Sequence, residues 1–124
     1  MKKKLLSMFL VFAMVFSLIP ATVFATEAEQ VYISISYDGA YINDTNETPI
    51  VHIPVSFTEI ASVNLTEYGL EEYLYDGDGD GNYDTTALQL IIYAHENLYG
   101  GDWSDVNFTG GPGSYYFKAG IFGF

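Results

Sequence analysis

A nine-residue acidic segment between two apolar stretches restricts the fold of this chain more than any other part of the sequence. The segment runs Asp76-Gly77-Asp78-Gly79-Asp80-Gly81-Asn82-Tyr83-Asp84. Carboxylates at its first, third and fifth positions can converge on one point, and the glycine at its sixth position allows the sharp turn that calcium loops need. Because close carboxylates repel one another by ~1 kcal/mol per pair in water, a counter-ion would favour the closed loop. The pattern predicts a tight cation-binding loop.

Five residues of this segment are the expected metal ligands. Asp76, Asp78 and Asp80 would supply side-chain oxygens, Asn82 a backbone carbonyl, and Asp84 a carboxylate that binds directly or through water. Oxygen ligands in this pattern suit Ca²⁺. The alternative is a solvated acidic linker in which Asp84 only caps the helix that follows.

The segment departs from an EF-hand at its twelfth position. An EF-hand places a bidentate glutamate there, whereas this chain has Ala87. Glu71 or Glu72 would supply the missing ligand if the chain folds back. We therefore expect an EF-hand-like loop of modest affinity, in the range ~10⁻⁴–10⁻³ M typical of extracellular modules.

The N-terminal residues have the pattern of a secretory signal peptide. Lys2, Lys3 and Lys4 precede an apolar run over residues 5–19, and the small residue Ala25 provides a cleavage point. The alternative is an N-terminal membrane anchor, but the run is shorter than the ~20 residues that a spanning helix needs. We expect a signal peptide over residues 1–25 and a single domain, incomplete at its C-terminus, over residues 26–124.

The predicted mature chain is short, acidic and free of cysteine. Its 99 residues contain all sixteen acidic residues but only one basic residue, Lys118, which leaves a net charge of −15 with histidine neutral. Such a surface repels nucleic acid and anionic lipid and attracts cations, so nucleic acid is excluded as a partner. A domain of this size without disulfides depends on its apolar core, on a metal or on neighbouring domains. We expect a secreted or cell-surface protein that does not insert into a membrane after signal cleavage.

Hydrophobic periodicity predicts a small α+β domain. Alternating apolar residues indicate strands over residues 31–37 and 50–57, paired as an antiparallel ribbon with Pro54 at an edge. Weaker patterns predict a strand over residues 63–66, a helical turn over 70–75 and a strand over 115–118. We expect one mixed β-sheet with one packed helix.

The only long helical pattern covers residues 85–99. Its apolar stripe includes Leu88, Ile92 and His95, with Asp84 or Thr85 as the expected N-cap. His95 is expected in the core or at its rim, and His52 on the polar side of its strand. Neither histidine has a partner at a zinc-ligand spacing.

Catalytic patterns are few in the sequence: Glu71 and Glu72 are conceivable as an acid–base pair, but solvated charge is the commoner role of such neighbours. No nucleophile elbow or phosphate-binding glycine motif occurs, so the chain is not expected to be an enzyme.

Aromatic residues gather near the end of the sequence. Trp103, Tyr115 and Tyr116 lie in or beside a glycine-rich loop, where they would stack on a bound ligand such as a sugar. The alternative is that these rings fill the core.

Short motifs over half of the chain resemble a known family. The motifs are Glu67-Tyr68-Gly69-Leu70, a helix from Thr86-Ala87-Leu88 through Tyr93-Ala94 to Glu96, Gly111-Pro112-Gly113-Ser114 before Tyr115-Tyr116, and Ile121-Phe122-Gly123. Together they resemble a domain of uncharacterised Gram-positive cell-surface proteins that is similar to the C-terminal β-domain of transcobalamin and intrinsic factor. The resemblance implies a β-grasp-like fold in a surface protein with repeated modules. It also implies cobalamin as a candidate ligand, contacted by the glycine-rich loop and the end at Phe122-Gly123.

Two functional hypotheses follow from the sequence. The first is a secreted or cell-surface, non-enzymatic binding or adhesion module with a calcium-stabilised loop, whose partner is an extracellular ligand or a neighbouring domain. The alternative is a domain that binds a small ligand, either cobalamin or a carbohydrate.

Overall fold

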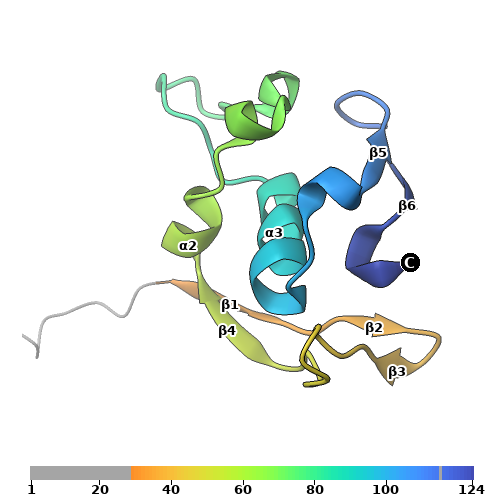
Figure 1. The fold of residues 1–124 in the computed structure, drawn as a ribbon. Helices are drawn as coiled ribbons and strands as arrows, with labels where there is room; N and C mark the ends of the chain where they lie inside the picture. Colours follow the sequence, from red (N-terminus) through yellow and green to blue (C-terminus); the bar gives the residue numbers. More distant parts are fainter. Residues whose placement is uncertain (1–28, 115) are drawn as a thin grey trace, which may run out of the picture.

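The computed structural model describes residues 29–114 and 116–124 (Figure 1). The predicted signal peptide, residues 1–25, and the candidate ligand residue Tyr115 lie outside these ranges. The elements in chain order are β1 (Gln30–Ile33), β2 (Ser36–Tyr37), β3 (Ala40–Tyr41), β4 (Ile53–Ser56), α2 (Phe57–Ala61), the 3₁₀ turns η2 (Leu65–Tyr68) and η3 (Glu71–Tyr73), α3 (Ala87–Tyr93), the π-helical η4 (Ala94–Tyr99), the 3₁₀ turn η5 (Trp103–Asp105), β5 (Asn107–Thr109), β6 (Tyr116–Ala119) and the 3₁₀ turn η6 (Ile121–Gly123).

The fold is α+β, as the sequence predicts, with one main helix and small antiparallel sheets. The strands of the described residues form three two-stranded ribbons, β1–β4, β2–β3 and β5–β6, where the sequence predicted one mixed sheet. Pro54 illustrates a reason for the smaller sheets. It lies in β4 opposite Tyr32 and has no N–H with which to extend a ladder, which restricts it to a strand at an edge.

The β1–β4 ribbon has the predicted antiparallel pairing, but both strands are shorter than the predicted ranges 31–37 and 50–57. Val31 pairs with Val55 on the inner face, where Val55 is 2% exposed. Tyr32 is exposed on the outer face and stacks on His52, with 4.3 Å between ring centroids. His52 is exposed, as expected, but it lies just before β4 with φ +53° and is not part of the strand.

The predicted strand over residues 63–66 is wrong. The chain forms the 3₁₀ turn η2 there, because the side chain of Asn64 accepts a hydrogen bond from the Thr66 N–H at 3.2 Å and caps the turn. Gly69 ends the turn in the left-handed conformation, with φ +68°. Local capping outweighs the β-propensity of two apolar residues here.

The short helix α2 was not predicted, because its first residue, Phe57, continues the alternating pattern of β4. Ser56 ends the strand and begins the helix with a complete capping box. Its Oγ accepts the Glu59 N–H at 3.2 Å, while the Glu59 carboxylate accepts the Ser56 N–H at 2.8 Å.

The predicted long helix exists over most of its range, as α3 followed directly by η4. Its N-cap is Thr86, not Asp84 or Thr85. Thr86 Oγ1 accepts the Gln89 N–H at 3.3 Å, and Gln89 Oε1 accepts the Thr86 N–H at 2.8 Å. The side-chain amide of Gln89 is buried and donates to the Val63 carbonyl at 2.9 Å, which fixes the start of α3 against the segment before η2.

The main core surrounds α3, which lies at the centre of the molecule between the β1–β4 ribbon, the turns η2 and η3, and the β5–β6 ribbon (Figure 1). The buried side chains of this core come from the segment that contains η2 and η3, from α3 and from η5, so the core joins elements of the second half of the chain. The buried members are Val63, Leu65, Leu70, Tyr73, Leu88, Ile92 and Trp103. Among the helices of residues 29–114 and 116–124, none has the length and hydropathy needed to span a bilayer.

Candidate metal centre

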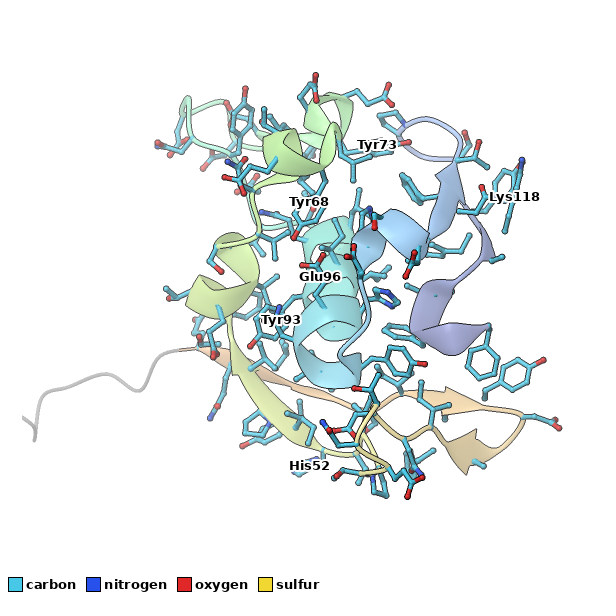
Figure 2. All side chains as sticks on the ribbon, in the orientation of Figure 1. His52, Tyr68, Tyr73, Tyr93, Glu96 and Lys118 are labelled. Atoms are coloured by element: carbon cyan, nitrogen blue, oxygen red, sulfur yellow. The ribbon has the colours of Figure 1, made fainter. Side chains whose placement is uncertain are left out.

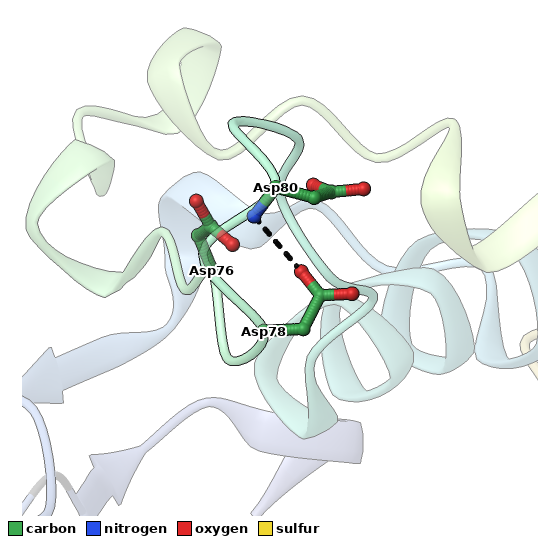
Figure 3. Close-up of side chains that lie close together, drawn as sticks. All are labelled: Asp76, Asp78 and Asp80. Atoms are coloured by element: carbon green, nitrogen blue, oxygen red, sulfur yellow. Dashed lines mark hydrogen bonds between the residues drawn. The ribbon is translucent and has the colours of Figure 1, made fainter.

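The acidic segment forms an exposed loop between η3 and α3, and three of its carboxylates lie close together (Figure 3). Asp76, Asp78 and Asp80 each offer one oxygen, and these oxygens lie within 4.8 Å of one another. Oxygen ligands of Ca²⁺ lie 2.3–2.6 Å from the ion, so opposite ligands are separated by about 5 Å. The cluster therefore has dimensions that could hold a divalent metal ion.

Backbone N–H groups of the loop hold these carboxylates in place. Asp76 accepts the Gly79 N–H at 2.7 Å with Oδ1 and the Gly81 N–H at 3.1 Å with Oδ2. Asp78 Oδ1 accepts the Asp80 N–H at 3.1 Å, the bond drawn in Figure 3. Gly81 has φ +90°, which confirms that glycine takes the turn at the sixth position.

The other two expected ligands have contacts of their own in the loop. Asp84 closes its base, because its Oδ2 accepts the Gly77 N–H at 2.7 Å and its N–H donates to the Tyr75 carbonyl at 2.7 Å. The side-chain amide of Asn82 donates to Asp80 Oδ2 at 3.0 Å, and its backbone N–H donates to Asp80 Oδ1 at 2.7 Å.

No further acidic side chain of the described residues joins the three carboxylates. Ala87, at the twelfth position, is the first residue of α3, and both Glu71 and Glu72 are exposed on η3 outside the cluster. A cation at this centre would complete its coordination with backbone oxygens or water.

Hydrogen bonding favours the ionised form of Asp80. The side-chain amide of Asn82 lowers the pKa of the Asp80 carboxyl below its usual value, and the backbone N–H of Asn82 adds to this effect. An ionised carboxylate is the form that binds a metal ion.

The three aromatic candidates have different environments. Trp103 is 7% exposed, and its ring packs in the core against Phe108 and Phe117, each with 5.9 Å between ring centroids. Because both neighbours are core rings, a ligand could not stack on Trp103 without displacing them. Tyr116 is 55% exposed, beside the ammonium group of Lys118. The small-ligand hypothesis stays a prediction and would depend on Tyr116 rather than Trp103.

His95 is 2% exposed, which confirms that it is a core residue. Both ring nitrogens have partners: Nδ1 accepts the Phe122 N–H at 3.1 Å, and Nε2 lies 3.2 Å from the Asp102 carbonyl. Sequence analysis gave the burial of His95 from the helical stripe. Its two partners lie far along the chain or in an irregular loop, where no sequence pattern indicates them.

Sequence analysis also missed a link between Tyr68 and Glu96, which Figure 2 places beside α3. The Tyr68 hydroxyl donates to Glu96 Oε2 at 2.5 Å. Burial raises the pKa of Tyr68 to about 12, and the hydrogen bond and negative charge of Glu96 contribute to the shift.

Comparison of the chain with protein-family models, curated proteins and solved structures found no match. The resemblance to the transcobalamin-like surface domain stays a prediction from the quoted motifs.

Proposed function

We propose that this protein is a secreted or cell-surface binding module without catalytic activity, whose acidic loop is stabilised by Ca²⁺. The observation that supports the metal site is the convergence of Asp76, Asp78 and Asp80 within 4.8 Å. The signal-like pattern of residues 1–25 supports an extracellular location, where Ca²⁺ is available to a site of modest affinity.

The position of the loop supports a structural role for the ion. The loop base, closed by Asp84, lies two residues before the Thr86 cap of α3, so an ordered loop fixes where the main helix begins. On its other side η3 contacts the glycine-rich loop, because the Tyr73 hydroxyl donates to the Gly110 carbonyl at 2.7 Å. Ca²⁺ would thus stabilise both the helix start and the loop next to Tyr116.

The test is calcium binding by the purified protein and by the variant Asp78→Asn. The asparagine keeps an oxygen that can accept the Asp80 N–H but removes one of three charges from the cluster. We expect the wild-type protein to bind Ca²⁺ in isothermal titration and to gain thermal stability. We expect the variant to bind at least about tenfold more weakly, since ligand charge sets the affinity of such loops.

Asp38→Asn is the matched control. Asp38 is an exposed aspartate before a glycine, like Asp78, but it lies in the β2–β3 turn and its substitution changes the net charge equally. Terbium luminescence excited through Tyr75 and Tyr83, which flank or lie in the loop, gives a second signal. Absence of both heat and luminescence in the wild-type protein at several millimolar metal, or equal binding by the two variants, would contradict the proposal.

A further inference from the structure

The buried imidazole of His95 is bonded to two segments that flank the β5–β6 ribbon. It projects from the π-helical η4 and is bonded on one side to η6, near the end of the chain, and on the other to the residue before η5. π-Helical turns are rare and often occur at functional sites. The space around the ring is tight: a Cβ on Gly101 would lie 2.5 Å from His95 Nε2.

The two bonds fix the tautomer of the ring. A backbone N–H can only donate, so Nδ1, which receives the Phe122 N–H, carries no proton. Nε2 then carries the proton and donates it to the Asp102 carbonyl. His95 is thus neutral in this structure, and its acceptor nitrogen faces a donor.

The segment held by this bond, residues 120–124, has an unfavourable backbone conformation. Phe122 has φ +50° and ψ +29°, a left-handed conformation that a bulky side chain rarely adopts. Its ring packs against His95 and Tyr99, with 5.7 and 6.1 Å between ring centroids. Phe124 contacts Tyr37 of the β2–β3 ribbon at 4.4 Å between centroids. Ile121 packs against the core, and the bond from the Phe122 N–H to His95 Nδ1 links the segment to η4.

The groups around the imidazole would accommodate a positive charge. Asp102 and Asp105 line a cavity of about 530 Å³, whose wall also includes His95, Tyr99 and part of the segment. Glu96 lies next to His95 in η4, and its oxygens are bonded to the Tyr68 hydroxyl and the Trp103 N–H. Among the residues that the structure describes, the lining of this cavity contains no lysine or arginine.

We propose that His95 is an acid-sensitive latch for residues 120–124. When Nδ1 takes up a proton, it becomes a donor that faces the Phe122 N–H, and this bond is lost. Two facing donors repel each other, and the left-handed conformation of Phe122 then lacks the contact that balances it. The segment leaves η4 and opens the wall of the cavity that Gly120, Gly123 and Phe124 form. Uptake of a proton by the imidazole, which acid promotes, therefore operates the latch.

The test follows the purified protein by NMR from about pH 7.5 to about pH 5, the interval over which histidine titrates. Ring ¹⁵N shifts should give the Nε2–H tautomer of His95 at the upper end and the doubly protonated ring at the lower end. The hydrogen-exchange protection factor of the Phe122 amide, which corrects for the intrinsic effect of pH, should fall by at least about tenfold in parallel. The amide of Ile92, in the core helix, should keep its protection.

Two asparagine variants separate the latch from a general acid effect. His95→Asn keeps an acceptor in the place of Nδ1 that cannot titrate, so Phe122 protection should no longer depend on pH. His52→Asn removes the exposed histidine and should leave the wild-type response unchanged. An Nδ1–H tautomer, constant Phe122 protection while His95 titrates, or loss of Ile92 protection at the same pH would each overturn the proposal. These three readouts use wild-type protein, so they decide the matter even if His95→Asn does not fold.

Discussion

The hydroxyl of Tyr68 and the carboxylate of Glu96 connect three separate turns of the chain. Glu96 Oε2 accepts the Tyr68 hydroxyl of η2, and Oε1 accepts the Trp103 N–H of η5 at 3.3 Å. A hydrogen bond to an ionised acceptor is stronger than one between neutral groups. Through this one carboxylate, η4 orients both η2 and the tryptophan that fills the core.

We expect Tyr68→Phe to destabilise the fold by about 1–2 kcal/mol, because a hydrogen bond to a charged group contributes about 1.5–3 kcal/mol and partial exposure to solvent reduces that value. The measurement is urea denaturation at neutral pH. Tyr41→Phe removes an exposed hydroxyl from the β2–β3 ribbon and serves as the control, with an expected change close to zero. Equal midpoints for the two variants would show that the bond to Glu96 contributes nothing.

The hydrogen bond between Tyr68 and Glu96 makes the free energy of unfolding depend on pH in alkaline solution. Because folding raises the pKa of Tyr68 from 10.0 to about 12, its stabilising contribution is complete below the unfolded value and is lost as pH rises through the folded value. A tyrosinate absorbance titration should contain a late step near pH 12 that is missing in Tyr68→Phe.

At the scale of elements, sequence patterns predicted the structural features that depend on residues close together in the chain. The apolar stripe gave the position of α3 and η4, and alternation gave the pairing of β1 with β4. The cap of α3 was misplaced, because Asp84 and Thr85 have equally suitable side chains. The tertiary position of Asp84, bonded to the Gly77 N–H, leaves Thr86 as the cap.

The candidate sites also differ in how far the sequence could predict them, according to whether their contacts are local or distant in the chain. The acidic loop is defined within nine residues, so its three converging carboxylates could be expected from spacing alone. The environment of Trp103 depends on the distant strand residue Phe117, and the sequence offered no means to choose between a core ring and a ligand-binding ring. The hydrogen-bond partners of His95 could not be predicted for the same reason, since Phe122 lies 27 residues further along the chain.

At the same scale, the capping box of α3 should stabilise the helix measurably. Thr86→Ala removes the side-chain oxygen that accepts the Gln89 N–H, and we expect a loss of about 1 kcal/mol. Thr86→Ser keeps the hydroxyl and should be close to the wild-type protein in urea denaturation. A threonine-to-alanine change without effect would mean that the buried Gln89 amide alone fixes the start of the helix.

For the whole molecule, the charge balance is the dominant property. Beyond residue 4 a single basic residue, Lys118, accompanies sixteen acidic ones, so most carboxylates have no cationic partner. Mutual repulsion of this kind opposes the compact state and is screened by salt.

We therefore expect sodium chloride to raise the melting temperature of the wild-type protein and of Asp78→Asn equally, by a few degrees, since about 1 kcal/mol corresponds to roughly 4–8 °C for a domain of this size. Calcium chloride at the same ionic strength should add a further increase in the wild-type protein alone, because only an intact cluster binds the ion. Thermal denaturation in the two salts separates screening from binding. If the wild-type protein gave identical denaturation curves in the two salts, the effect of calcium would be ionic screening alone and not binding.

The register of the β1–β4 ribbon determines how the molecule would respond to a pulling force. Gln30, the first residue of β1, pairs with Ser56, which leads directly into α2. Tension on the chain ahead of Gln30 would therefore load the ladder one pair at a time from this end, as in a zipper, rather than share the load among all its bonds. The ribbon would yield at low force and lengthen the chain while the core around α3 stays folded.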